Sequence, residues 1–185
     1  MALVSAKNIS VMSVLAASLF TTGAFADASP STTDINITAK VVDATCTAGW
    51  DTSGVSLDLG SVSTSSLAAK GDIGASKPLT LTLTGCTGMT KVHLSATGNK
   101  DSDDSTAFSN SGTAKGVAVQ LFGGEGQSTQ LLPQDSTQTA DYTIKDGNAT
   151  LALLAKLERT TDASDEEAFA AGTVVSKATL NLTYE

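Results

Sequence analysis

The chain is acidic, poor in aromatic residues and long enough for one domain with a hydrophobic core. It has 185 residues, 11 of them basic and 19 acidic, for a formal net charge of −8. An acidic surface repels the phosphates of nucleic acids and of anionic membranes. The composition therefore predicts no nucleic-acid partner.

The first 26 residues are typical of a secretory signal peptide. Lys7 supplies a positive charge, residues 9–20 form an apolar run, and residues 24–26 (Ala-Phe-Ala) make a small-x-small cleavage site. The apolar run is too short for a stable membrane span. We therefore expect export, cleavage after Ala26, and a mature chain of residues 27–185 that is one charge unit more negative.

Only two cysteines are present, Cys46 and Cys86, and both lie in the expected mature chain. An even number of cysteines in an exported protein most simply makes a disulfide. The alternative is a pair of buried free thiols. Closing a loop of this size should stabilise the fold by about 3–4 kcal/mol in the chain-entropy model.

The stretch before the first cysteine alternates apolar and polar residues with a period of two. This pattern predicts a strand with Ile35, Ile37, Ala39 and Val41 on one face. We assign residues 27–44 to an N-terminal extension and residues 45–185 to the main domain. A half-apolar strand at a free N-terminus must find a sheet, either its own or that of another molecule.

Short alternating segments continue along the main domain and predict an all-β sandwich. The Asp146-Gly147 pair predicts a tight hairpin turn. Residues 65–70 predict a short helical turn, and residues 162–171 a surface loop with at most one turn of helix. The expected strands cover residues 55–59, 79–83, 92–96, 117–121, 142–144, 151–157 and 178–184.

Few residues are candidates for catalysis or metal binding. His93 is the only histidine, so a Ser-His-Asp catalytic set would have to use it; a solvated strand histidine is the favoured interpretation. Asp101, Asp103 and Asp104 could suggest calcium, but the loop lacks the glycine and terminal glutamate of a helix–loop–helix calcium site. We therefore predict no enzyme activity, no cofactor and no metal.

Six segments of the chain carry a family pattern in their order and spacing: residues 40–46 around the first cysteine, 55–62, 79–86 before the second cysteine, 116–121, 146–148 and 178–185. Together they resemble the type 1-like fimbrial pilins of the chaperone–usher class, and most of all a major rod subunit. Ala39 stands where that family often has glycine, and the extension contains no glycine, which leaves a minor or adaptor subunit as an alternative.

The resemblance implies an immunoglobulin-like sandwich that lacks its final strand and is completed by a donor strand from another subunit. A periplasmic chaperone would first fill the groove, and the next subunit's extension would replace it at an outer-membrane usher. The product would be a homopolymer, a cell-surface fimbrium. The implied donor residues are Ile35, Ile37, Ala39 and Val41, and the implied groove strand carries Ala178, Leu180, Leu182 and Tyr184.

A self-sufficient secreted binding domain, such as a lectin-like sandwich, is the alternative from another functional class. Such a domain would close its own sheet and remain a stable monomer. A pilin would aggregate, polymerise slowly or need a chaperone.

Overall fold

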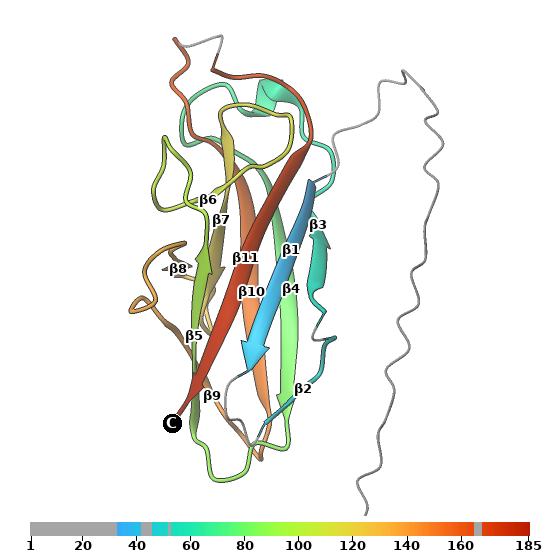
Figure 1. The fold of residues 1–185 in the computed structure, drawn as a ribbon, viewed down its shortest axis with the longest axis vertical. Coiled ribbons are helices and arrows are strands. Elements are labelled where there is room, and N and C mark those ends of the chain that lie inside the picture. The colour runs from blue at the N-terminus through green and yellow to red at the C-terminus, as the bar shows by residue number, and fades with distance from the viewer. Residues whose placement is uncertain (1–32, 42–45, 52, 165–167) are drawn as a thin grey trace, which may run out of the picture.

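A computed structural model of the chain describes residues 33–41, 46–51, 53–164 and 168–185, with residues 33–41 described by their backbone. Two β-sheets face each other in an elongated sandwich (Figure 1). Within these ranges, no helix has the length and apolar character needed to cross a membrane. The expected signal peptide and its cleavage site lie outside the described residues.

The first sheet has five strands in the order β3-β1-β11-β5-β9. Strand β1 is parallel to β11 and antiparallel to β3, whereas the remaining neighbours are antiparallel. The strands are β1 (Thr33–Val41), β3 (Val55–Asp58), β5 (Lys91–Gly98), β9 (Ala140–Thr143) and β11 (Val174–Tyr184).

The second sheet is antiparallel, in the order β2-β4-β10-β7-β6, with β8 also paired to β7. A short 3₁₀ helix, η1 (Thr64–Ser66), lies between β3 and β4 where the sequence predicts a helical turn. The strands are β2 (Thr47–Ala48), β4 (Ile73–Thr84), β6 (Phe108–Ser109), β7 (Val117–Gly123), β8 (Thr129–Leu131) and β10 (Ala149–Arg159).

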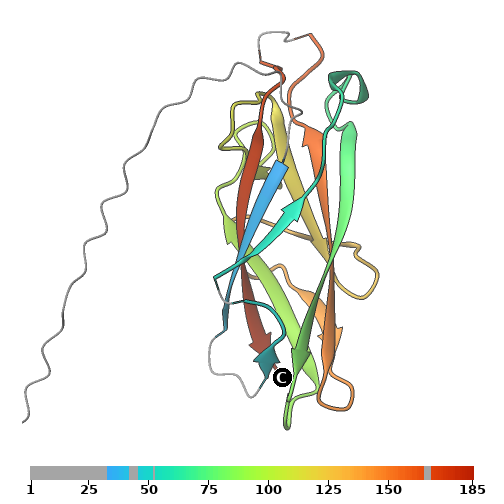
Figure 2. The same cartoon turned by 90° about the vertical axis from the view of Figure 1, so that its right-hand side faces the viewer.

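The two sheets face each other in Figure 2, and the core lies between them. It is built from every second residue of the long strands. Leu151 and Leu153 of β10 are fully buried, as are Val92 and Leu94 of β5. Tyr142 joins the layers, because its hydroxyl donates to the Ala152 carbonyl (2.8 Å) and accepts from the Gly124 amide (2.8 Å). Burial raises the pKa of Tyr142 to about 12.

The predicted strands of the main domain all form, but several are longer than the alternation indicates, and β4 is extended most. Strand β4 begins at Ile73, and its first half contains Pro78. Proline is tolerated there because β2 covers β4 only at Leu83 and Thr84, which leaves Pro78 on an unpaired edge. Strands β2, β6 and β8 have two or three residues, too few for a period of two to be recognised.

The predicted hairpin turn is confirmed at the start of β10. Asp146 and Gly147 have positive φ angles of 51° and 73°, the conformation of a type I′ turn. Lys145 and Asn148 close the turn through two main-chain hydrogen bonds of 2.8 and 2.9 Å.

The predicted disulfide is also confirmed. Cys46 precedes β2 and Cys86 follows β4, so the bridge fastens the two chain segments at one end of the sandwich.

Loss of this disulfide should be costly. We expect the double variant Cys46→Ala/Cys86→Ala to lose about 3–4 kcal/mol of unfolding free energy, because the unfolded chain regains the freedom of the open loop. Chemical denaturation of oxidised and variant chains measures the difference. The native chain should also be about 2 Da lighter than the reduced chain. Thiol labelling of native, unreduced protein would contradict the assignment.

Candidate functional site

The candidate site is the gap between β3 and β11, which β1 occupies (Figure 1). In the described part of the chain, β3 and β11 share no ladder with each other; each pairs with β1. Without β1, one edge of β11 would lose all nine of its paired positions, Val174–Leu182. Such an edge presents a row of unpaired amide and carbonyl groups.

The register of β1 against β11 matches the apolar alternation of both strands. Ile37 is the partner of Ala178, Ala39 of Leu180 and Val41 of Leu182. Ala178, Leu180 and Leu182 are buried, whereas the intervening Lys177 and Thr183 are exposed. Because paired residues of neighbouring strands share a face of the sheet, the four apolar positions of β1 register with the inward face.

The opposite wall and the floor of the gap are also apolar. Val55 and Leu57 of β3 are partly buried against the core and are the register partners of Ile37 and Ile35. Tyr184, the last of the four predicted groove residues, is half-buried and contacts the same core. The structure therefore pairs three predicted extension residues, Ile37, Ala39 and Val41, with three predicted groove residues of the same chain. Ile35 pairs instead with the buried Ser176, and Tyr184 lies beyond the end of the β1 ladder.

An apolar pocket continues the site beyond the start of β1. It lies beside Val174, the β11 partner of Thr33, and Leu67, Val117 and Phe169 are among its lining residues. Arg159 fixes the surrounding loops: its buried guanidinium donates to the carbonyls of Leu67, Ala68, Thr161 and Asp162 at 2.8–3.0 Å.

Arg159 has no carboxylate partner among these contacts. Its charge is stabilised by the four carbonyl dipoles and by the ring of Phe169, whose centroid lies 4.2 Å away. No pattern in the sequence indicates this arrangement, since the donors come from one side chain and the acceptors from the backbone.

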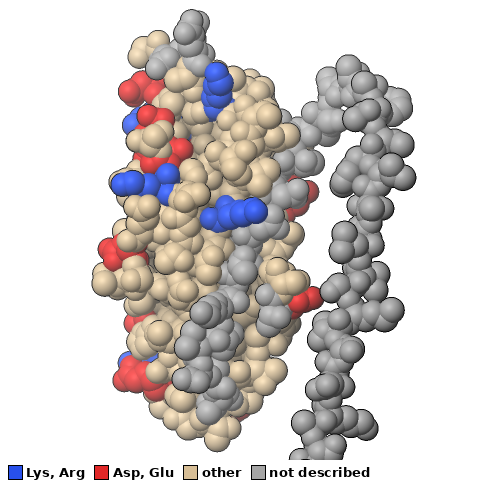
Figure 3. Space-filling view, in the orientation of Figure 1, with Lys and Arg blue, Asp and Glu red and all other residues tan. Residues whose placement is uncertain are grey.

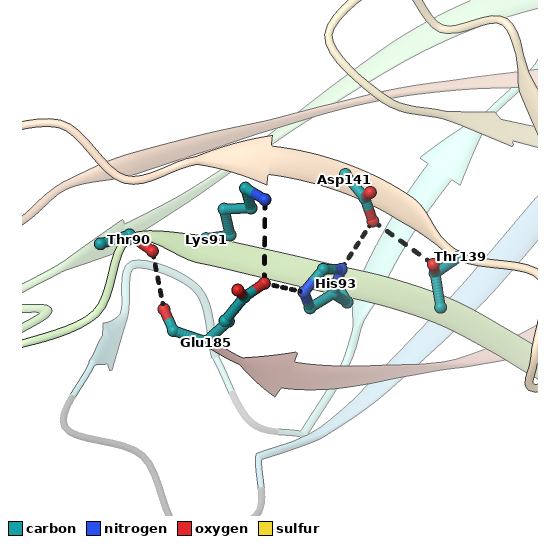
Figure 4. Close-up of polar contacts among 6 residues, drawn as sticks. All are labelled: Thr90, Lys91, His93, Thr139, Asp141 and Glu185. Carbon is teal, nitrogen blue, oxygen red and sulfur yellow. Dashed lines mark hydrogen bonds and ion pairs between the residues drawn. The ribbon is translucent and has the colours of Figure 1, made fainter.

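The C-terminal residue is fixed at the other end of β11 (Figure 4). The main-chain oxygen of Glu185 accepts from the amides of Thr90 (2.6 Å) and Lys91 (3.1 Å). The Thr90 hydroxyl also donates to this oxygen (3.3 Å; Figure 4). The side-chain carboxylate of Glu185 lies 3.2 Å from His93 Nε2 and 3.8 Å from Lys91 Nζ. These contacts hold the end of β11 against the start of β5.

His93 links three strands on the outer face of the first sheet. Its Nδ1 lies 2.7 Å from Asp141 of β9, and its Nε2 faces Glu185. The hydrogen bond with Asp141 is the main cause that raises the pKa of His93, partly opposed by desolvation. The sequence analysis expected a solvated histidine and did not anticipate these two carboxylate partners, because both are distant in sequence.

The acidic loop does not assemble a metal site in the described residues, where no group of three His, Cys, Asp or Glu side chains could hold an ion. Asp101 instead accepts from the amides of Asp103 and Asp104.

In the space-filling view most of the face shown is uncharged, and acidic side chains gather along its left edge (Figure 3).

One acidic side chain missed by the sequence analysis is buried. Glu158, at the end of β10, is 5% exposed, and its Oε1 has no hydrogen-bond partner. Burial, together with the neighbouring Asp104, raises the pKa of Glu158 to about 8. Burial also acts upward on the pKa of Asp104, but the hydrogen bonds from Glu158 and Thr106 outweigh it and lower that pKa.

This pair should make stability depend on pH. Folding raises the pKa of Glu158 from 4.5 to about 8, so the folded chain binds more protons and the unfolding free energy falls as pH rises through this interval. The slope from one group is at most about 1.4 kcal/mol per pH unit. Denaturation between pH 4.5 and 9 should show this fall. Glu158→Gln should make the fall shallower and leave the part that the raised pKa of His93 causes in the same direction.

Glu125→Gln is the matched control for that experiment, because Glu125 is exposed. The control should keep the wild-type pH dependence. The same slope in wild type and Glu158→Gln would show that the buried pair does not cause it.

Comparison with known proteins adds a family to this geometry. The chain matches the fimbrial protein family over residues 35–185. It is 33% identical over 134 residues to the long polar fimbria protein A of Salmonella typhimurium, covering 70% of this chain and 75% of that protein. It is 30% identical over 181 residues to the F17 fimbrial protein of Escherichia coli, covering 90% and 97%.

Among solved structures, the P pilus rod subunit PapA has a similar fold. The two superpose with a TM-score of 0.62 at 24% identity, over 77% of this chain and 100% of PapA. At that identity the likeness concerns the fold alone. The family match extends over most of the chain, and it includes β1 from residue 35 onward, the disulfide and the C-terminal strand. The chain therefore belongs to the fimbrial protein family, whose members are structural, non-enzymatic components of cell-surface pili.

Proposed function

We propose that this chain is the structural, rod-forming subunit of an adhesive surface fimbria. Each subunit gives its N-terminal extension, residues 27–44, to the groove of the next, so that the chain forms a homopolymer. A periplasmic chaperone captures the subunit first, and an outer-membrane usher is the site of exchange. Residues 45–185 form the pilin domain that receives the strand.

The register of β1 is the observation that carries this proposal. Ile35, Ile37, Ala39 and Val41 pair with the inward positions of β11, whereas the polar residues between them pair with the outward positions. A strand of this sequence therefore fits a groove flanked by β3 and β11, whichever copy supplies it. Backbone hydrogen bonds would supply affinity, and the alternation would set the register.

The groove strand is also suited to a first partner. Strand β11 carries buried Ala178, Leu180 and Leu182 and ends at a terminal residue held by the amides of Thr90 and Lys91. A chaperone strand that replaces β1 would find the same apolar positions and the same open backbone edge. This supports chaperone recognition through β11.

Two alternatives predict different fibres. A minor or adaptor pilin would occur in few copies per fibre. A self-sufficient, lectin-like binding domain would occur in none, and would be recovered from the medium as a monomer.

Composition of sheared surface fibres separates these functions. Fibres are removed from cells that express the chain with its secretion partners, purified by size, and quantified by mass spectrometry. The proposal expects this chain to be the main component by mass. A trace amount in fibres built of another protein would favour the adaptor, and absence from fibres would overturn the proposal.

A further inference from the structure

We propose that doubly protonated His93 acts as a pH-dependent clamp that holds the end of β11 against β5 and β9. The clamp consists of His93, Asp141 and Glu185, on the outer face of the first sheet (Figure 4). It is a property of the fold, whereas its consequence for assembly rests on the proposed function, in which β11 is the groove strand.

The positions of the two carboxylates require a proton on both ring nitrogens. His93 Nδ1 lies 2.7 Å from Asp141 Oδ1, and Nε2 lies 3.2 Å from Glu185 Oε2. An ionised carboxylate can only accept hydrogen bonds, and a neutral imidazole has a single N–H. Both contacts are therefore hydrogen bonds only when the ring is doubly protonated and charged.

The charged groups around the ring also favour its cationic form. Asp141 approaches from β9 and Glu185 from the end of β11. Glu125 lines the same surface depression as Asp141 and Lys91. Lys91, on β5, is the one basic side chain among these four, and its Nζ lies 3.8 Å from Glu185 Oε2. The surroundings are therefore net negative, which stabilises an imidazolium.

Loss of the proton breaks one side of the clamp. The shorter contact, with Asp141, keeps the remaining N–H on Nδ1. The lone pair of Nε2 then faces Glu185 Oε2, so two acceptors meet and the Glu185 side chain is left with its longer contact to Lys91. The hydrogen bond with Asp141 is the main cause that raises the pKa of His93 from 6.5. The clamp is therefore complete below pH 6.5 and is lost as pH rises through the raised pKa.

The clamp fixes the strand end that borders the groove. Glu185 forms the last rung between β11 and β5, because its amide donates to the Lys91 carbonyl (3.1 Å) and its main-chain oxygen accepts from the Thr90 and Lys91 amides. The β1 ladder ends three residues earlier, at Leu182. On the proposed function, the same contacts order the end of the groove strand in each subunit of a fibre at acidic pH.

The ring can be observed on its own, because His93 is the only histidine in the sequence. In mature chain with isotope-labelled histidine, NMR should show both ring nitrogens protonated at acidic pH and a titration midpoint above 6.5. Asp141→Asn should move the midpoint to lower pH. Asp135→Asn is the matched control and should leave it unchanged, because Asp135 bonds instead to Thr137. A wild-type midpoint at or below that of Asp141→Asn would overturn the proposal.

Hydrogen exchange tests whether the ring holds the strand end. The amides of Thr90 and Lys91 donate to Glu185 and should lose protection by about two- to fivefold as pH rises through the midpoint, as expected for a partly exposed charge pair. Exchange rates are corrected for the intrinsic effect of pH. They are compared with amides of β10, which report the effect of Glu158 on the whole fold.

Two substitutions of the ring separate its charge from its shape. His93→Arg keeps a cation with several donors at every pH, so protection should be retained without the pH-dependent fall. His93→Gln removes the charge, so protection should be low at every pH. A fall that persists in either variant, or no fall in wild type, would overturn the clamp.

The clamp and the proposed function fail in different measurements. The clamp is measured in the mature chain, whereas the proposed function is tested by the composition of sheared fibres. Unchanged protection through the His93 midpoint overturns the clamp and leaves the proposed function standing. Absence of the chain from fibres overturns the proposed function, and the clamp remains a property of the fold.

Discussion

Ile37→Asp is expected to abolish fibre growth. Position 37 registers with buried Ala178, so an inserted strand carries the new carboxylate to the inward face of the groove. Burial of an unpaired charge costs several kcal/mol, far more than one side-chain contact returns. The subunit's own groove residues are unchanged, so its chaperone should still capture it.

Asn36→Asp is the matched control, because it introduces the same carboxylate one residue away. Position 36 registers with exposed Lys177, where a charge keeps its hydration. Fibre yield, measured by electron microscopy and by the mass of sheared material, should stay near wild type. Equal fibre yields from the two variants would show that the apolar face of β1 does not determine strand donation, and would contradict the assignment of residues 35–41 as the donor strand.

Removal of residues 182–185 should block an earlier step than Ile37→Asp does, the binding of the subunit by its chaperone. The truncation deletes Leu182, which is 3% exposed, and moves the end of the chain by about 13 Å. Loss of one buried leucine alone costs about 2–5 kcal/mol. It also removes Glu185 and with it the links to Thr90, Lys91 and His93. We expect no chaperone complex and degradation in the periplasm.

Thr183→Ala is the control for the truncation, since Thr183 is exposed on the outer face of the same strand. Periplasmic level and co-purification with the chaperone measure both variants. Truncated subunit recovered with its chaperone at the wild-type level would show that the end of β11 is not the recognition element. A self-sufficient sandwich would then explain the chain better.

The strands of this fold were accessible from the sequence because most are exposed on one face. Alternation in β10 and β11 follows directly from a buried inner face and a hydrated outer face. The first half of β4 lacked that signal, since Ala75, Lys77 and Pro78 do not alternate with a clear inner set. Strands of two residues carry no period at all.

The electrostatic features were not accessible, because they depend on residues far apart in the chain. His93 meets Asp141 and Glu185 only after β9 and β11 flank β5. The alternation of β10 predicts that Glu158 points outward into solvent. In the structure it is buried next to Asp104. A register shift between Leu157 and Glu158 adds to the irregularity at that end of β10.

The alternation of residues 35–41 does not determine whether the strand enters the groove of its own chain or that of a neighbour. Both require the same apolar face and the same partner strand. Assembly therefore has to be tested between two distinguishable chains.

The most direct measurement is a crosslink between two subunits within a fibre. One chain carries Asn36→Cys and the other carries a single cysteine on the outer face of β11, so neither can bridge position 36 to β11 alone. The second cysteine is either Lys177→Cys, the partner of position 36 in the parallel ladder, or Thr179→Cys, its partner when the strand is reversed over the same span. Fibres grown from the mixture are oxidised and mapped by mass spectrometry. Strand exchange predicts a disulfide between position 36 of one subunit and β11 of its neighbour. Fibres that grow without this link in either pairing would contradict it.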